Sequence, residues 1–119
     1  MVSPVPARRP LFVTEWQHLF VVLINADFED LIDLERLDMA LEIGRLTGKH
    51  VAVDASRIPF MSAEVLTTLL RHRQRTGHLP WLVGPLSPPT TRRLEISGTL
   101  RLFEIFPTLL EATAHSRGE

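Results

Sequence analysis

The sequence contains no cysteine, carries almost no net charge and has no long apolar run. Without cysteine the chain has no disulfide, no thiolate metal ligand and no cysteine nucleophile, which suits a reducing compartment. Its 13 basic and 14 acidic residues leave a net charge of −1, so electrostatics give no reason to expect nucleic acid or an anionic membrane as the main partner. The longest apolar run, Leu19–Ile24, is far below the roughly 20 residues of a bilayer span. We therefore expect a soluble, cytoplasmic protein with no nucleic-acid or membrane partner.

Signatures of catalysis are missing as well. The five histidines stand at positions 18, 50, 72, 78 and 115 and show no metal-ligand spacing. The chain has neither a Gly-x-Ser-x-Gly elbow nor a glycine-rich phosphate loop. We therefore expect no catalytic residue, no bound metal and no enzyme activity.

Two clusters of charge have structural explanations. Residues 27–42 hold seven acidic side chains and one basic side chain, Arg36. Such a cluster could hold Mg²⁺ if its oxygens converged in space. Part of this segment lies in the first turn of an expected helix, where anions are favoured, so a solvated acidic face, able to steer a basic partner, is the preferred interpretation. Arg71, Arg73 and Arg75 stand in the last turns of another expected helix, where cations suit the helix dipole. No aromatic residues are interleaved with them to stack on bases.

A chain of 119 residues with 45% hydrophobic residues can form one globular domain with a real core. The first ten residues contain three prolines and two arginines but no apolar segment typical of a signal peptide, so we interpret residues 1–10 as a flexible tail. We expect the folded domain to span residues 11–115, followed by a short tail at 116–119.

The hydrophobic pattern alternates between strand and helix periods, which predicts an α/β fold with a mixed sheet of four to five strands and about four helices. Apolar residues at helical spacing after Asp33 predict a helix whose inner stripe includes Leu37 and Leu41 and is widened by Ile43 and Leu46. The segment 102–106 is compatible with a short strand or with irregular structure. Strands are expected at 11–16, 19–24, 51–53 and 79–83, and the helices at 33–47, 62–76, 88–97 and 108–115.

The segment Val51–Leu70, VAVDASRIPFMSAEVLTTLL, resembles the central signature of STAS domains, particularly the bacterial anti-sigma factor antagonists. In that family an apolar strand is followed by Asp-x-Ser, an apolar pair, Asp-Ser-Ser-Gly-Leu and an apolar helix. Here Asp54-Ala55-Ser56 matches the first motif, Phe60-Met61 the apolar pair and Leu66 the closing leucine. The segments 25–29 and 94–103 also resemble family motifs, so the likeness covers about residues 19–114.

This resemblance implies a sheet with helices mainly on one face, no cofactor, and a role in transcription regulation through protein–protein interaction. The implied partner is an anti-sigma factor, often itself a serine kinase. In such systems the unmodified antagonist sequesters the anti-sigma factor, and phosphorylation of the first serine of Asp-Ser-Ser-Gly-Leu acts as a switch that breaks the complex. The implied partner-binding residues are Asp27, Phe28, Glu29, Ser56, Met61, Ser62, Ala63, Glu64 and Thr67.

The sequence departs from the family pattern at the switch itself. Ala63 takes the phosphoacceptor position and has no hydroxyl, while Glu64 takes the position of the second serine. Three consequences stay open: constitutive binding, phosphorylation of Ser62 instead, or regulation elsewhere. As an acceptor, Ser62 competes with its expected role as the N-cap of the following helix, because a capping hydroxyl already bonds a helix N–H.

Two other interpretations remain. A degenerate STAS module can scaffold a larger assembly or self-associate, and we expect a monomer or a weak homodimer. A nucleotide-binding or nucleotide-hydrolysing domain is the alternative from a different class, because some STAS domains are reported to bind nucleotides, although the chain lacks a phosphate loop.

Overall fold

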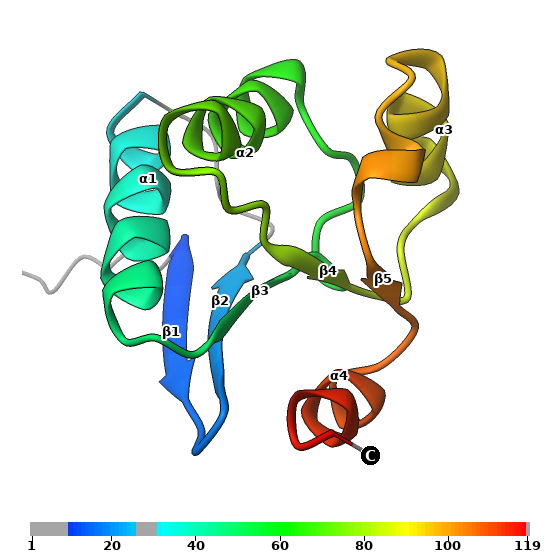
Figure 1. The fold of residues 1–119 in the computed structure, drawn as a ribbon. Coiled ribbons are helices and arrows are strands. Elements are labelled where there is room, and N and C mark those ends of the chain that lie inside the picture. Colours follow the sequence, from blue (N-terminus) through cyan, green and yellow to red (C-terminus); the bar gives the residue numbers. More distant parts are fainter. Residues whose placement is uncertain (1–9, 26–30, 119) are drawn as a thin grey trace, which may run out of the picture.

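The structure, a computed structural model, describes residues 10–25 and 31–118, which form a five-stranded sheet with helices on both faces (Figure 1). The strands follow the spatial order β1-β2-β3-β4-β5. The first pair, β1 and β2, is antiparallel, and every other pair is parallel. This arrangement confirms the predicted mixed sheet. In chain order the elements are β1 (Leu11–Glu15), β2 (Leu19–Ile24), α1 (Leu31–Leu46), β3 (His50–Asp54), α2 (Ala63–Thr76), β4 (Trp81–Val83), α3 (Pro88–Ile96), β5 (Ile105–Phe106) and α4 (Leu109–Ser116), with a 3₁₀ turn η1 (Leu100–Leu102) between α3 and β5.

The apolar run of β2 is covered from both sides, as expected of a strand inside an α/β fold. Its side chains alternate between two cores. Phe20, Val22 and Ile24 face the larger core, which is formed with α1, α2 and α3, whereas Leu19 and Val21 face a smaller one that includes Ala112 of α4. Most helices therefore cover one face, and α4 covers the opposite face (Figure 1), which confirms the expected layering.

Helix α1 begins two residues before the predicted start and presses closely on the sheet. Leu37, Leu41 and Gly44 are buried on its inner side. The prediction that Ile43 and Leu46 widen this inner stripe was wrong, because the side chains are 52% and 70% exposed. A helical period locates apolar faces but does not say which of two such faces meets the sheet.

Helix α2 has the ends that the sequence predicts. Ser62 is its N-cap, and Gly77 ends it in the left-handed conformation with φ of 78° while its N–H donates to the carbonyl of Arg73. The third parallel strand is shorter than predicted and begins at Trp81, because Pro80 has no N–H to donate to the sheet. Within the described part of the chain, no helix has the length and apolarity required to traverse a bilayer.

The segment for which strand and irregular structure were both open contains both. A 3₁₀ turn at Leu100–Leu102 leads into β5, which pairs in parallel with β4. On the α4 side of the sheet, Trp81 stacks on the ring of His50 with centroids 4.3 Å apart and also contacts Phe106 and His115. This aromatic cluster anchors α4 to the end of the sheet.

Candidate functional site

The loop between β3 and α2, residues 55–62, lies outside the carboxyl end of β3 and between α2 and α3 (Figure 1). In open α/β sheets, the carboxyl ends of the strands are where ligands and partners are usually bound. Two hydrogen bonds hold the loop to β4 and to the residue that caps α3. The N–H of Ala55 donates to the carbonyl of Val83 at 2.9 Å, and the hydroxyl of Ser87 donates to the carbonyl of Pro59 at 2.8 Å.

Asp54 and Ser56 form a local turn at the start of this loop. The backbone N–H and the hydroxyl of Ser56 both donate to Oδ1 of Asp54, at 2.9 and 2.6 Å. Such an arrangement is an Asx-type turn, in which the carboxylate replaces a backbone acceptor. The Asp-x-Ser motif therefore has a structural role here, and the exposed hydroxyl of Ser56 is already engaged.

The end of the loop is shaped by the helix that follows. The hydroxyl oxygen of Ser62 accepts a hydrogen bond from the N–H of Val65 at 3.1 Å, which confirms its predicted role as N-cap. Ala63 is the first residue of α2 and is exposed, and Glu64 is exposed beside it. Thr67, also exposed, stands one helical turn after Ala63 and so continues the same outer strip.

Met61 does not contribute to this surface. Its side chain is fully buried and packs in the main core together with Ile58, Val65 and Leu66. The expectation that Met61 contacts a partner directly is therefore corrected, because burying its thioether is what seats the start of α2 on the sheet. The expected contacts at Asp27, Phe28 and Glu29 lie outside the described residues.

Helix α3 adds residues that the sequence did not point to. The guanidinium carbon of Arg93 lies 5.0 Å from the ring centre of Phe60, a cation–π geometry. Phe60 is 48% exposed, and Ile96, one turn after Arg93, is 71% exposed. Because Phe60 and Arg93 are far apart in the sequence, no local pattern links them. Together with Ala63 and Glu64, they make a mixed apolar and charged surface between α2 and α3.

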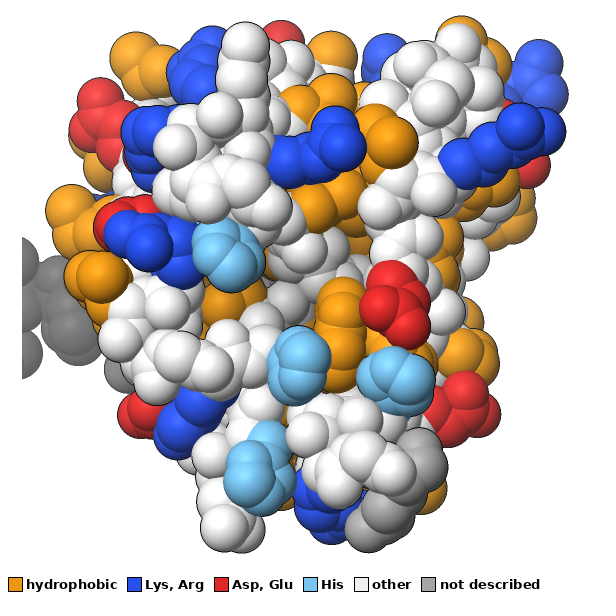
Figure 2. Space-filling view, in the orientation of Figure 1, with side chains coloured by type: hydrophobic (Ala, Val, Ile, Leu, Met, Phe, Trp, Pro, Cys, Tyr) orange, Lys and Arg blue, Asp and Glu red, His pale blue; other side chains and the backbone are white. Residues whose placement is uncertain are grey.

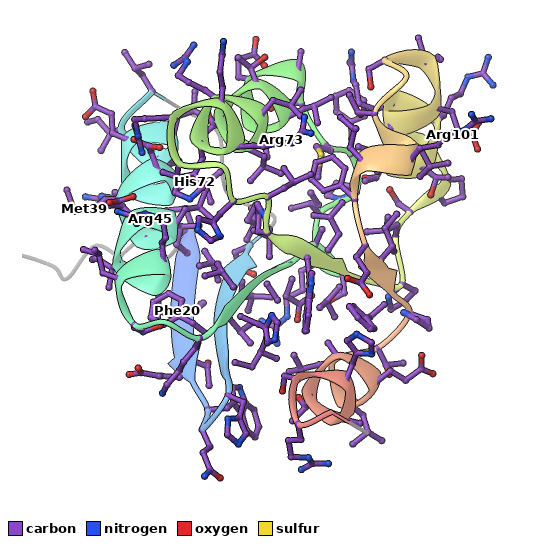
Figure 3. All side chains as sticks on the ribbon, in the orientation of Figure 1. Phe20, Met39, Arg45, His72, Arg73 and Arg101 are labelled. Atoms are coloured by element: carbon purple, nitrogen blue, oxygen red, sulfur yellow. The ribbon has the colours of Figure 1, made fainter. Side chains whose placement is uncertain are left out.

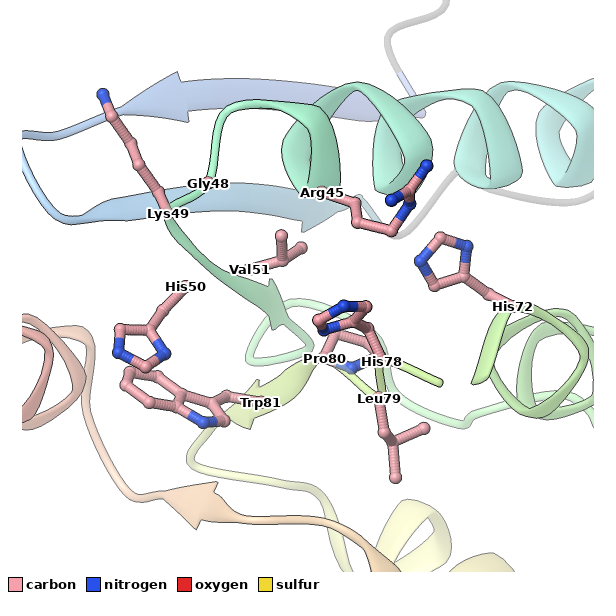
Figure 4. Close-up of a pocket in the computed structure, with 10 residues that line it drawn as sticks. All are labelled: Arg45, Gly48, Lys49, His50, Val51, His72, His78, Leu79, Pro80 and Trp81. Carbon is pink, nitrogen blue, oxygen red and sulfur yellow. The ribbon is translucent and has the colours of Figure 1, made fainter. Parts of the chain in front are cut away.

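A concavity lies at the amino-terminal ends of β3 and β4, next to the carboxyl ends of α1 and α2 (Figure 4). This cavity of about 310 Å³ is lined by several basic side chains. The arginine and the lysine among them are already paired: Arg45 binds Glu42, and Nζ of Lys49 donates to Glu15 and to the carbonyl of Trp16. Helix carboxyl ends also carry partial negative charge, so the cavity offers little attraction for an anion.

No metal site emerges from the described ranges, 10–25 and 31–118, in which no group of three or more histidine, aspartate or glutamate side chains is placed so that it could hold a metal ion. What the surface around Phe60 and Ala63 offers is shape, apolar contact and fixed charge. These properties suit recognition of another protein.

Several solved structures have a fold similar to that of this chain. A scan against protein-family models finds no match for the sequence, and a search of curated protein sequences finds none either. An anti-sigma factor antagonist from Mycobacterium paratuberculosis is similar, with a TM-score of 0.73 and 20% identity over 90% of this chain and 92% of that chain. The unphosphorylated anti-sigma factor antagonist SpoIIAA gives a TM-score of 0.72 and 16% identity over 92% and 97% of the two chains.

A proposed anti-sigma factor antagonist from Thermotoga maritima gives a TM-score of 0.71 and 14% identity over 90% of this chain and 94% of that chain. The chain therefore has the fold of anti-sigma factor antagonists, which confirms the STAS-like fold that the sequence resemblance implied.

Proposed function

We propose that this protein is an anti-sigma factor antagonist, not an enzyme, and that it binds an anti-sigma factor through the surface formed by loop 55–62, the start of α2 and the adjoining side of α3. The fold shared with solved antagonists over about nine-tenths of the chain supports this role. The observation that carries the proposal is the exposed start of α2. There Ala63, Glu64 and Thr67 form an accessible strip beside Phe60.

Binding by this surface requires little reorganisation. Ala55 and Pro59 are held to the sheet and to α3 by hydrogen bonds, and Met61 is fixed in the core. A partner therefore meets a preorganised loop, and little conformational entropy is lost on association. The methyl group of Ala63 lets a partner backbone approach the first turn of α2 closely.

We further propose that binding is constitutive. A phosphate on residue 63 would bring nearly two negative charges to the centre of the docking surface, where they are costly to desolvate against an acidic or apolar face. Ala63 cannot carry one. The hydroxyl oxygen of Ser62 is engaged in the helix cap, so phosphorylation of Ser62 competes with the structure of α2. In this proposal the amount of the protein, and not its modification, sets how much anti-sigma factor is sequestered.

The test is a calorimetric titration of the purified chain with the anti-sigma factors of the same organism, before and after incubation with ATP. We expect one of them to bind, and we expect mass spectrometry to find no phosphate on the wild-type chain. Ala63→Ser restores a hydroxyl at the acceptor position. With a kinase-type partner it should gain one phosphate and lose affinity.

Ala63→Asp adds a single charge and should weaken binding by about tenfold, because a charge buried without a partner is disfavoured at an interface. Leu110→Asp places the same charge on α4, where the original side chain is 76% exposed, and serves as the matched control. If no anti-sigma factor binds the wild-type chain, the proposal fails. If Ala63→Asp and Leu110→Asp bind as well as the wild type, the docking surface lies elsewhere.

A further inference from the structure

The outer face of α1 is apolar although the described part of the chain leaves it uncovered. Ile32, Met39, Ile43 and Leu46 are 56%, 63%, 52% and 70% exposed. Figure 3 shows Met39 pointing away from the sheet at the edge of the molecule. In Figure 2 apolar side chains lie at this edge beside acidic and basic ones. A helix that is apolar on both faces is expected to be buried on both, and the sheet covers only the inner face of α1.

The exposed residues form a seam. Ile32, Met39 and Leu46 follow one another at heptad spacing, and Ile43 stands one turn after Met39. This spacing is typical of a helix that packs along a second helix. A contact of this type needs a partner helix with apolar residues in the same arrangement, and α1 itself has them.

The charges beside the seam indicate how a second α1 would lie. In an antiparallel pair with its two-fold axis at Met39, Ile32 of one copy faces Leu46 of the other. In the same arrangement, Arg36 faces Glu42. A parallel pair would instead place Arg36 opposite Arg36, which is unfavourable. The antiparallel arrangement therefore places Ile32, Met39 and Leu46 opposite apolar residues and Arg36 opposite an acidic one, as a self-complementary two-fold interface requires.

A shallow hollow beside the seam contains carboxylates that would bind Arg36 of the second copy. It is lined by three acidic residues, one basic residue and two apolar residues: Glu35, Asp38, Met39, Glu42, Ile43 and Arg75. Within it Arg75 contacts Asp38 at 3.3 Å and reaches Glu42 at 4.0 Å. Glu42 also accepts hydrogen bonds from Arg45 beside the hollow, so three carboxylates stand against two guanidinium groups and the hollow keeps a net negative charge. An incoming Arg36 side chain would balance it.

We infer that two copies of this chain associate through antiparallel packing of their α1 helices. Helix α1 lies on the side of α2 away from α3 (Figure 1), so loop 55–62 stays open in both copies. The dimer then presents two docking surfaces, and a partner that is itself dimeric gains avidity. A contact limited to one helix pair buries less than about 1,200 Å², which is typical of weak, reversible association.

The experiment is sedimentation velocity of the full chain over a wide range of concentrations. We expect a reversible monomer–dimer equilibrium. Met39→Glu places two like charges on the two-fold axis and should weaken the dimer at least about tenfold. Leu110→Glu introduces the same charge at an exposed apolar residue of α4 and should leave the equilibrium unchanged.

Charge reversal tests the direction of the helices. Arg36→Glu alone should weaken the dimer, and the double variant Arg36→Glu/Glu42→Arg should recover most of the loss, because the facing charges are again opposite. Circular dichroism confirms that each variant is folded. Because the chain has no cysteine, Met39→Cys provides a single site at which a short bis-maleimide should link two copies, whereas Leu110→Cys should not be linked.

Three results overturn the inference: a wild-type chain that is monomeric throughout the range, a dimer that Met39→Glu leaves intact, or a double charge reversal no better than Arg36→Glu. If the wild type is monomeric and Met39→Glu instead weakens binding of an anti-sigma factor, the face serves that partner and not a second copy.

Discussion

The ring of Phe20 in β2 lies directly against Gly44 in α1, so that a Cβ placed on Gly44 would be 2.6 Å from the ring carbon Cδ1. Real Cβ atoms do not approach so closely. The same Cβ would also be 3.0 Å from a methyl group of Val51 in β3. This glycine therefore sets the distance between α1 and the two strands beneath it, and through α1 the position of the whole outer face.

Replacing Gly44 with alanine is expected to destabilise the protein by about 1–3 kcal/mol, the usual cost of overpacking a core. In a helix without this contact, the same change should stabilise by up to about 1 kcal/mol through higher helix propensity. Urea denaturation shows whether the free energy of unfolding of the variant is lower or higher than that of the wild type. A variant as stable as the wild type, or more so, would show that α1 does not press on Phe20.

The matched control is Gly48→Ala. Gly48 has a positive φ of 76°, but a Cβ there would meet nothing within 4 Å. The loss should come from backbone strain alone, about 1–2 kcal/mol. Comparing the two variants separates a steric cost from a conformational one.

The hydroxyl of Ser62 is expected to stabilise the fold through the cap of α2. Removing it in Ser62→Ala leaves the N–H of Val65 without its partner and should cost about 1 kcal/mol. Ser62→Gly should lose only a few tenths of a kcal/mol, because glycine is a tolerated N-cap. Thermal and urea denaturation of both variants measure the difference. If Ser62→Ala is as stable as the wild type, the hydroxyl of Ser62 is not needed for the cap, and Ser62 becomes a candidate phosphoacceptor again.

The sequence predicts those parts of the fold that depend on residues close together in the chain. The apolar run 19–24 fixes β2, and the pair Ser62 and Gly77 marks both ends of α2. Contacts between segments that are far apart in the chain have no comparable sequence pattern. The approach of Arg93 to Phe60 depends on how α3 docks, so half of the candidate surface was not foreseen. The burial of Met61 has no local signal either, because an apolar residue in a loop suits both a core and an interface.

Phe60 is expected to carry much of the affinity for a protein partner, because phenylalanine is enriched at protein interfaces and its neighbour Arg93 is of a residue type that is frequent in hot spots. Its side chain is 48% exposed, so Phe60→Ala should affect folding little. Binding of the anti-sigma factor should weaken by about 2 kcal/mol or more. Leu110→Ala, a truncation of a more exposed apolar side chain on α4, should bind as the wild type does. If Phe60→Ala binds the anti-sigma factor with unchanged affinity, the β3–α2 loop does not belong to the interface.

The imidazole of His72 makes the stability of the protein depend on pH. Its side chain is 2% exposed on the inner side of α2, and burial lowers its pKa below the ordinary value of 6.5, with the nearby positive charge of Arg75 acting in the same direction. Asp38 and Glu42 face it from α1 and oppose the shift, and Arg45 adds to it.

With the pKa of His72 lower in the folded state, the unfolded chain binds the extra proton more readily. Stability should therefore be full above pH of about 6.5 and should fall as the pH drops through that value towards the folded pKa. Urea denaturation at a series of pH values measures the slope. His72→Gln should flatten this slope, whereas Gln74→Ala, which alters an exposed and non-titrating residue of α2, should leave the slope unchanged. A slope that His72→Gln does not change would mean that other groups cause the loss of stability in acid.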